Sequence, residues 1–309
     1  MFRILVLAAC AAMAAAGPGP WTGAFDLDRD GLDDRAEQRL IERFQPRLRI
    51  SASDCAERPS ALAANSARPV PAWPDGTVYA RVHPVTRTDE PGAWVEIQYF
   101  HLWAQDCGWN AHALDVEHVA ALLHADSPDA APEAWTARYW YAAAHQDTIC
   151  NASHGARAES LGAADRGAMV WIARGKHASY LTAHRCRWGC GTDRCADSVA
   201  LQPAALVNLG EREAPLNGAV WVAWAGWPLG AQMRSDFTPG VVAKIDRAAP
   251  GQIVAVNDIR TFVKGFLTST STGAQGLLKG RQGASAALGA TAHAMGRAIT
   301  VTGRTIIGR

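Results

Sequence analysis

The sequence predicts an all-β fold, an antiparallel β-sandwich that follows a short N-terminal loop and helix and precedes a partly flexible C-terminal tail. The chain has 309 residues, of which 49% are hydrophobic, and this is enough apolar material for a sizeable core. Long helical periodicity is absent from residue 75 to residue 235, whereas β-branched and aromatic residues alternate with polar ones between turn residues. The expected strands lie in the segments 77–85, 93–103, 114–124, 135–145, 168–174 and 218–227.

The first residues, MFRILVLAACAAMAAAGPGP, have the layout of a secretory signal peptide. Arg3 precedes an apolar run that ends near Ala16. An alternative interpretation takes the LAAC segment at 7–10 as a lipoprotein box. No later run approaches the roughly 20 apolar residues that a transmembrane helix needs. We therefore expect residues 1–16 to be a signal peptide and the protein to be secreted or periplasmic.

Six cysteines follow the expected signal peptide, an even number in a chain bound for an oxidising compartment. We expect three intrachain disulfides, and the sequence leaves their pairing open. The alternative is a zinc site in the cluster CRWGCGTDRC with His177 and His184, because thiolate and imidazole ligands suit that ion. The six residues are Cys55, Cys107, Cys150, Cys186, Cys190 and Cys195.

An acidic segment after the signal, DLDRDGLDDRAE, has the spacing of a calcium loop of the EF-hand-like kind. Hard Ca²⁺ takes six to eight oxygens, and carboxylates at the alternating positions supply them while Gly31 allows the sharp turn. The alternative is an acidic turn that caps the following helix. The expected ligands of a structural calcium ion are Asp26, Asp28, Asp30, Asp34 and Glu37, with the backbone carbonyl of Leu32.

The segment DRAEQRLIERF after the loop predicts a helix, because its apolar residues fall on one face and Pro46 follows it. We divide the chain into a signal peptide (1–16), a calcium loop with helix (17–45), a β-sandwich (46–240) and a tail (241–309). Beyond residue 258 the tail has seven basic residues and no acidic one, and it is rich in Gly, Ala, Ser and Thr. We expect it to be partly flexible and able to attract an anionic surface. The net charge of the whole chain is only +1, which gives no case for nucleic acid.

The segment NAHALDVEHV places polar side chains at the head of a predicted strand. Asp115 and Glu117 are two residues apart, so on a strand they share a face, and His112 lies just upstream. Carboxylates held together repel unless a cation separates them, which favours a second divalent ion, Mg²⁺ or Ca²⁺, with Asp106 as a possible fourth ligand. The alternative is a solvent-facing edge strand with a loop histidine, and the spacing alone does not choose between the two.

The pattern His-x-x-Asp-x-Glu resembles the Gly-His-Arg-His-Asp-Trp-Glu signature of the necrosis- and ethylene-inducing-like proteins, which are secreted β-sandwich cytolysins. It is also similar to the Gly-Asp-Trp-Glu strand of the vacuolar protein sorting-associated 62-like family, whose other strands resemble RFQPRLRIS, WVEIQYFHLW, NASHGAR and VWIARGKHASYL. The resemblance implies a β-sandwich over residues 43–235 and metal ligands at His112, Asp115 and Glu117. It also implies that His154 and His177 line the same cavity, where they are the candidates for catalysis.

Three classes of function agree with these observations. The first is a monomeric, secreted metal-binding protein that recognises a lipid or glycan head group and damages membranes. The second is a metal-assisted hydrolase in which His154 or His177 serves as base. The third is a structural or interaction module of the cell envelope, without catalysis. No serine-nucleophile elbow, zinc-protease helix or phosphate-cradling loop occurs in the sequence, which favours the first class over the second.

Overall fold

The structure is a computed structural model, and it describes residues 25–63, 70–87, 89–108, 111–146, 148, 150–187, 189, 193–219 and 232–256. The chain divides into two units, residues 1–146 with 150–257 and residues 147–149 with 258–309. Only Thr148 of the second unit is described. The expected signal peptide, most of the expected strand at 218–227 and the basic part of the tail therefore lie outside the described residues.

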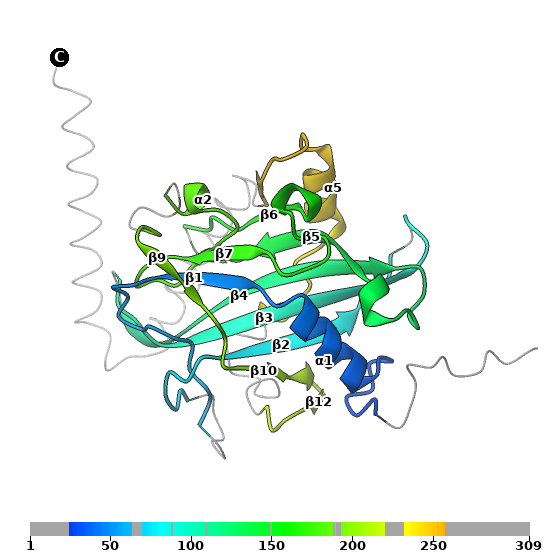
Figure 1. The fold of residues 1–309 in the computed structure, drawn as a ribbon, viewed down its shortest axis with the longest axis horizontal. Helices are drawn as coiled ribbons and strands as arrows, with labels where there is room; N and C mark the ends of the chain where they lie inside the picture. Colours follow the sequence, from blue (N-terminus) through cyan, green and yellow to red (C-terminus); the bar gives the residue numbers. More distant parts are fainter. Residues whose placement is uncertain are drawn as a thin grey trace, which may run out of the picture. The chain divides into compact units, whose positions relative to one another are not determined.

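The first unit is a β-sandwich of two main sheets, as predicted (Figure 1). The larger sheet has the order β10-β2-β3-β4-β5-β6-β13, the smaller one has the order β8-β7-β1-β9, and β11 pairs with β12. Most neighbours are antiparallel, but the pairs β1–β7 and β10–β2 are parallel, so both main sheets are mixed. The strands are β1 (Arg47–Ser51), β2 (Thr77–Pro84), β3 (Ala93–Asp106), β4 (His112–Ala125), β5 (Thr136–Ala142), β6 (His154–Arg157), β7 (Met169–Ile172), β8 (Ser179–Tyr180), β9 (Ser198–Leu201), β10 (Ala205–Asn208), β11 (Gly210–Glu211), β12 (Ala214–Pro215) and β13 (Val254–Ala255).

Helices are short and lie at the borders of the sheets. The longest is α1, which forms where the sequence predicts it and buries Leu40 and Ile41 in the main core. The hydroxyl group of Tyr99 on β3 donates a hydrogen bond to the carbonyl of Ile41 at 3.0 Å, so the helix is attached to the inner face of the larger sheet. None of the described helices is long and apolar enough to cross a membrane. The helices and 3₁₀ turns are α1 (Asp34–Arg43), η1 (Pro132–Ala134), η2 (Glu159–Leu161), α2 (Ala183–Arg187) and α5 (Pro239–Arg247).

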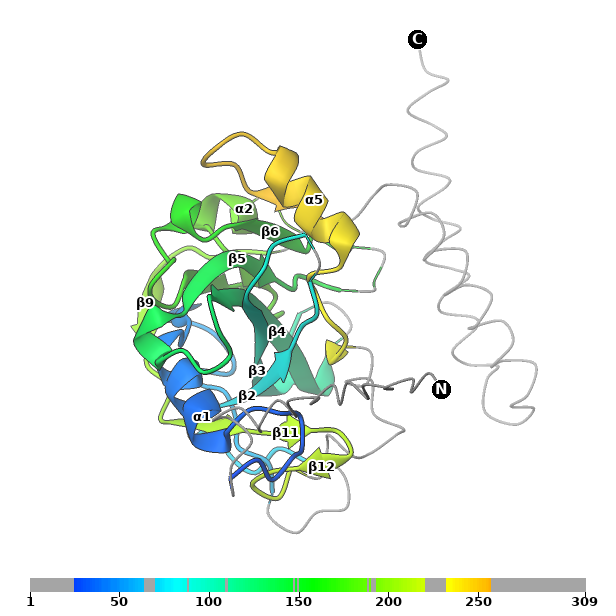
Figure 2. The same ribbon diagram turned by 90° about the vertical axis from the view of Figure 1, so that its right-hand side faces the viewer.

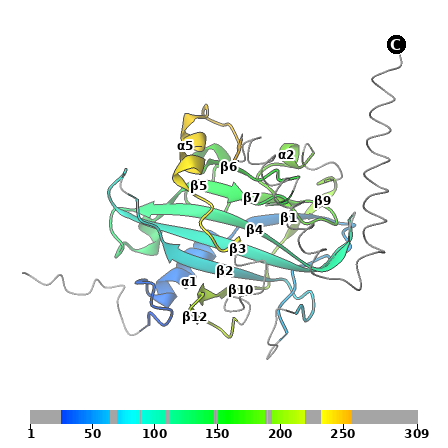
Figure 3. The same cartoon turned by 180° about the vertical axis from the view of Figure 1, so that it is seen from behind.

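Both faces of β3 are buried, whereas an alternating strand in a two-layer sandwich usually has one solvated face. Val95 and Ile97 point into the core between the sheets. The opposite face carries Glu96 and Gln98, which the segment ahead of α5 covers (Figure 3). The carboxylate of Glu96 accepts a hydrogen bond from the backbone N–H of Asp236 at 2.9 Å, so the buried polar group is satisfied.

Two disulfides join parts of the first unit, Cys55–Cys107 and Cys186–Cys195. They confirm a disulfide-stapled fold and leave no pair of thiolates at these four positions for the alternative zinc site. Cys190 lies outside the described residues, so the third expected disulfide stays a prediction. Because β13 is an edge strand of the larger sheet, the chain contributes to this sheet beyond residue 240, where we expected the tail to begin.

Candidate functional site

The end of the β3–β4 hairpin brings several ionisable side chains to the inner face of the larger sheet. In the register of the hairpin, Asp115 lies opposite Trp103 and Glu117 lies opposite His101. Directly opposed residues share a face of the sheet, and the rings of Trp103 and His101 are fully buried. Asp115 and Glu117 therefore share a face, as the spacing predicts. That face points into the molecule, with only 12% of the Asp115 side chain exposed.

His177 lies between two carboxylates at this point. Its Nδ1 atom is 3.0 Å from Oδ2 of Asp115, and its Nε2 atom is 3.2 Å from Oδ1 of Asp54. Burial tends to lower the pKa of His177, but the hydrogen bonds from Asp115 and Asp54 outweigh it and raise the pKa above its ordinary value. Both ring nitrogens of His177 are therefore engaged by carboxylates, and neither is free to act as a base.

Glu117 lies among further carboxylates at this site. It is 7% exposed, and the described residues donate no hydrogen bond to it. Burial raises the pKa of Glu117 well above its ordinary value, and the nearby carboxylates of Asp115, Asp193 and Asp106 raise it further, against the opposing effect of Lys176. Oxygen ligands held together in this way fit a divalent cation, because a cation would remove both the repulsion and the cost of burial.

Asp106 and His112 are placed differently from the expected ligand set. The Oδ1 atom of Asp106 accepts from the backbone N–H of Gly108 at 2.7 Å, and its Oδ2 atom accepts from Nζ of Lys176 at 2.6 Å. The side chain of His112 is half exposed, with Nε2 3.4 Å from Asp106. Among the described residues, no three ligand atoms within 4.8 Å of one another come from the expected set at this hairpin. Asp115 and Glu117 thus share one face of the sheet, but His112 does not converge with them on one point here.

The backbone is strained at this site. Leu114, within β4, has φ 55°, and the histidines 145 and 177 have φ values of 54° and 50°. Non-glycine residues in this left-handed region cost about 1 to 3 kcal/mol each and cluster at functional sites. The register of the hairpin continues unbroken to Asp106 and His112, so the alternation of the strand places His112, three residues before Asp115, on the opposite face from the two carboxylates.

His154, the other expected catalytic residue, is bonded to the backbone on both sides. Its Nδ1 atom donates to the carbonyl of Ala152 at 3.0 Å, and its Nε2 atom accepts from the N–H of Leu181 at 3.0 Å. Burial lowers the pKa of His154 to about 4, so the ring is neutral at physiological pH. This geometry favours a structural role for His154 in joining β6 to the chain after β8.

A basic pocket adjoins the acidic cluster. It has a volume of about 380 Å³ and lies over the Cys55–Cys107 disulfide. Its cationic lining consists of Arg174, Lys176 and Arg194, and Lys176 also holds Asp106. Buried carboxylates and the basic side chains of this pocket thus lie next to each other, joined by the contact between Lys176 and Asp106. This arrangement of charges suits a ligand that has both an anionic group and hydroxyl oxygens.

Sequence reasoning missed the residues that come from outside the hairpin. Asp54 and Asp193 follow no strand pattern, and both reach the site because the neighbouring cysteines fix their loops. Their proximity to Cys55 and Cys195 in the sequence is the only signal for them. Asp54, Cys55 and His177 offer ligand atoms within 4.8 Å, but the sulfur of Cys55 is bonded to Cys107 and is no thiolate ligand.

The N-terminal loop forms a second acidic cluster, beside β11 (Figure 2). Ligand oxygens of Asp26, Asp28 and Asp34 lie within 4.8 Å of one another, and so do those of Asp28, Asp30 and Glu37. The structure therefore brings together all five acidic residues that the loop spacing singled out. Burial and mutual repulsion raise the pKa of Asp28 to about 6, that of Asp30 to about 7 and that of Glu37 to about 10.

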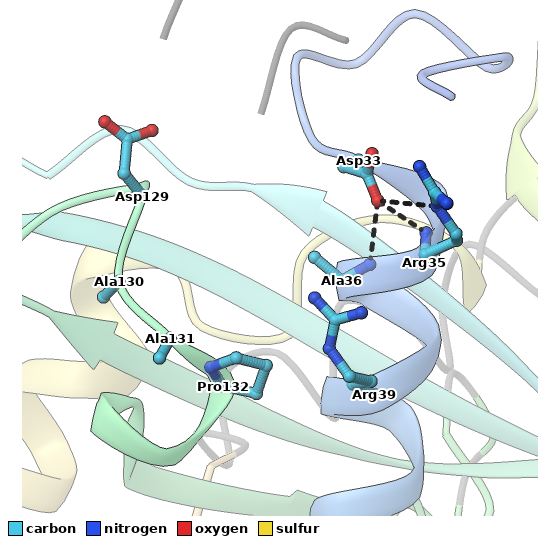
Figure 4. Close-up of a pocket in the computed structure, with 8 residues that line it drawn as sticks. All are labelled: Asp33, Arg35, Ala36, Arg39, Asp129, Ala130, Ala131 and Pro132. Carbon is cyan, nitrogen blue, oxygen red and sulfur yellow. Dashed lines mark hydrogen bonds and ion pairs between the residues drawn. The ribbon is translucent and has the colours of Figure 1, made fainter. Parts of the chain in front are cut away.

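A further pocket, of about 340 Å³, lies beside the start of α1 (Figure 4). Arg39 and Pro132 lie on opposite sides of it, Arg35 is paired with Asp33, and the carboxylate of Asp33 is also bonded to the helix backbone. We assign no ligand to it.

No protein-family profile and no curated protein matches the chain. Its structural neighbours are necrosis- and ethylene-inducing-like proteins. NLPPya in complex with mannosamine is 17% identical, with a TM-score of 0.36, over 60% of this chain and 76% of that one. The non-toxic HaNLP3 protein is 15% identical, with a TM-score of 0.37, over 69% of this chain and 91% of that one. At these values the likeness does not assign the chain to a family, and the similarity to the vacuolar protein sorting-associated 62-like proteins stays a prediction.

Proposed function

We propose that this protein is a binding protein that recognises an anionic, hydroxyl-bearing head group of a lipid or glycan at the end of the β3–β4 hairpin. The observation that carries the proposal is Glu117, a buried carboxylate that accepts no hydrogen bond from the described residues and is surrounded by further carboxylates. We propose Glu117 and Asp115 as holders of a divalent cation, Mg²⁺ or Ca²⁺. When bound, the ion would supply open coordination positions for hydroxyl or phosphate oxygens.

The basic pocket supports an anionic ligand rather than a neutral one. Arg174 and Arg194 are exposed at its opening, and Lys176 stands between the pocket and Asp106. Guanidinium groups bind phosphate or carboxylate through paired hydrogen bonds. A head group whose hydroxyls reach toward Glu117 would therefore place its charged substituent against these three cations.

Binding is favoured over hydrolysis because the two candidate bases are engaged. Both ring nitrogens of His177 contact carboxylates, and both of His154 contact the backbone. The disulfides support a place of action outside the cytoplasm, either secreted or periplasmic. Membrane damage is the further consequence that we propose for a lipid-borne head group.

The test measures binding of the purified protein to phosphatidylcholine vesicles with and without phosphatidylinositol, and to soluble inositol phosphate, in Ca²⁺, in Mg²⁺ and in EDTA. We expect binding that requires the acidic lipid or the soluble phosphate and that EDTA abolishes. Glu117→Gln and Arg174→Ala should weaken it. The matched controls Glu133→Gln and Arg212→Ala, at exposed positions elsewhere, should not.

Each arm of this test has a defined outcome. Binding that Glu117→Gln leaves unchanged would exclude the proposed site. Release of dye from the vesicles would add membrane damage to recognition, whereas release of inositol phosphate from the lipid would establish the hydrolase alternative. The absence of binding to every probe, with the fold intact, would favour a structural module.

A further inference from the structure

We infer that the loop from Asp26 to Glu37 binds one Ca²⁺ ion that fastens α1 to the β10–β11 edge of the sandwich, because Asn208 of β10 holds the last ligand, Glu37. This site is distinct from the proposed head-group site. It uses a motif that the proposed function leaves unexplained.

Buried oxygen atoms without partners are the first observation. Glu37 is 0% exposed and Asp28 is 4% exposed, yet within the described part of the chain Oε1 of Glu37 and both carboxylate oxygens of Asp28 have no partner in hydrogen-bond geometry. Oδ1 of Asp26 and Oδ2 of Asp30 are likewise buried and unpaired. Buried acceptors in native proteins are almost always satisfied, and leaving one unpaired costs about 1 to 3 kcal/mol. Oxygens in this state, in two overlapping groups that share Asp28, mark the position of a cation.

The donor set identifies the ion. Every ligand is an oxygen, and no histidine or cysteine is part of either group, which argues against zinc. Five carboxylates, together with the carbonyl of Leu32 that the loop spacing adds, can supply the six to eight oxygens that Ca²⁺ takes. Mg²⁺ instead keeps several waters and requires stricter octahedral geometry. Glycine at position 31, with φ 96°, allows the turn between the third and fourth ligands, and this conformation strains any other residue.

Helix capping does not account for the cluster. The cap of α1 is Asp33, whose Oδ1 atom accepts from the backbone N–H groups of Arg35 at 3.0 Å and Ala36 at 3.2 Å (Figure 4). Asp33 belongs to neither group of converging ligands. The acidic residues around it are therefore not needed as caps, and Asp33 provides a matched control within the same loop.

The sandwich contributes a positioning residue. Nδ2 of Asn208 donates to Oε2 of Glu37 at 2.6 Å, which leaves Oε1 for the ion. Oδ1 of Asn208 accepts from the backbone N–H of Gly210, so both polar atoms of the side chain are engaged. The backbone carbonyl of Asn208 accepts from Nδ2 of Asn217, which holds the backbone at this position. A Cβ atom on Gly210 would lie 3.1 Å from Cβ of Asp28, so the loop packs directly on the strand edge. Partners of this kind typically change metal affinity 10- to 100-fold.

The experiment measures Ca²⁺ affinity by calorimetry and Tm in Ca²⁺ and in EGTA, with Mg²⁺ as the competing ion. The full mature chain carries Glu117→Gln as background, so that the proposed head-group site contributes no ion. We expect one Ca²⁺ per chain, a Tm that rises with Ca²⁺, and little response to Mg²⁺. Failure here would leave the head-group proposal untouched, because that site has its own ligands.

Three variants in this background separate an ion site from an acidic turn. Glu37→Gln should abolish the response to Ca²⁺ but should not lower Tm in EGTA, because it removes a repelling charge. Asn208→Ala should weaken Ca²⁺ binding about 10- to 100-fold. Asp33→Ala should lower Tm equally in Ca²⁺ and EGTA and leave the affinity within a factor of about two. A background protein without bound Ca²⁺, or a Glu37→Gln variant that keeps it, would overturn the inference.

Discussion

The imidazole of His177 lies flat against the indole of Trp103, with ring centroids 4.4 Å apart and an interplanar angle of 11°. The indole nitrogen of Trp103 donates to Nδ1 of His101 at 2.9 Å, and Nε2 of His101 lies 3.0 Å from the hydroxyl of Ser179. A single chain of contacts thus connects β8, β3 and the cluster of carboxylates. The position of His177 is set by packing as well as by its two acidic partners.

Removal of Asp54 should destabilise the protein, because Asp54 is one of the two acidic partners of the buried His177 ring, whose pKa these partners raise. The side chains of both Asp54 and His177 are fully buried. We expect Asp54→Ala to lower the free energy of unfolding by about 3 to 5 kcal/mol, as when one partner of a buried ion pair is removed. Asp54→Asn should cost less, since the amide oxygen still accepts from Nε2. Urea unfolding at neutral pH measures the difference. Asp89→Ala, which removes an exposed partner of Arg87, should change stability by less than about 1 kcal/mol.

The two disulfides should differ in their contributions. Cys55–Cys107 spans 52 residues and Cys186–Cys195 spans 9. A disulfide restricts the unfolded chain, and this effect predicts a contribution to the free energy of unfolding of about 4 kcal/mol for the first bridge and about 3 kcal/mol for the second. Serine pairs at each bridge, compared by urea unfolding, test this order. The first pair should also weaken head-group binding, because Asp54 and Asp106 lie next to its cysteines. Unchanged head-group binding by the variant that lacks Cys55–Cys107, compared with the unaltered protein, would show that this bridge does not hold the site.

Two glycine-to-alanine changes should have opposite effects on the stability of the protein. A Cβ atom at position 167 would lie 1.6 Å from the backbone oxygen of Gln45, where the starts of β1 and β7 meet, so Gly167→Ala should destabilise by about 1 to 3 kcal/mol or more. Gly240, in the first turn of α5, is exposed, and a Cβ atom there would meet only Oγ1 of Thr238, at an ordinary contact distance of 4.0 Å. Gly240→Ala should stabilise by about 0.5 to 1 kcal/mol. Thermal unfolding of the two variants distinguishes these outcomes, and a destabilised Gly240→Ala would contradict the placement of α5.

Acidification should destabilise the protein through His154. The folded state holds the pKa of His154 at about 4, below its ordinary value of 6.5. Between these values the unfolded chain takes up a proton at His154 that the folded chain does not, so the contribution of His154 to the free energy of unfolding is complete above pH 6.5 and falls as the pH decreases toward 4. The loss approaches about 3 kcal/mol. His154→Gln should be less stable at neutral pH but should show a flatter dependence over this range, measured by urea unfolding at successive pH values. An unchanged slope would assign the acid sensitivity to other groups.

The elements of this fold that could be predicted are those whose pattern of apolar and polar residues lies within one short stretch of sequence. The alternation of β3 and β4 and the apolar face of α1 are visible in the sequence because each element buries its own residues. The parallel pairing of β1 with β7 and of β10 with β2 is not, because the partners are distant in the chain. Two-residue strands such as β8 are too short to show a period.

The same distinction applies to the candidate site. Asp115 and Glu117 were predictable because they belong to one strand and its period of two. Asp54 reaches His177 over 123 residues of sequence, and no spacing rule covers such a pair. The left-handed backbone of Leu114 was not predictable either, because nothing in the sequence of this strand indicates it.

The contact between Glu37 and Asn208 also has a consequence for the order of folding. The two residues are 171 positions apart, so during synthesis the acidic loop emerges long before the strand that completes it. Until β10 is made, Glu37 lacks its partner and the loop cannot dock. The segment that is translated early in the described chain is therefore among the last to be fixed. Closure of so long a loop adds only a modest entropic cost, because that cost grows with the logarithm of length.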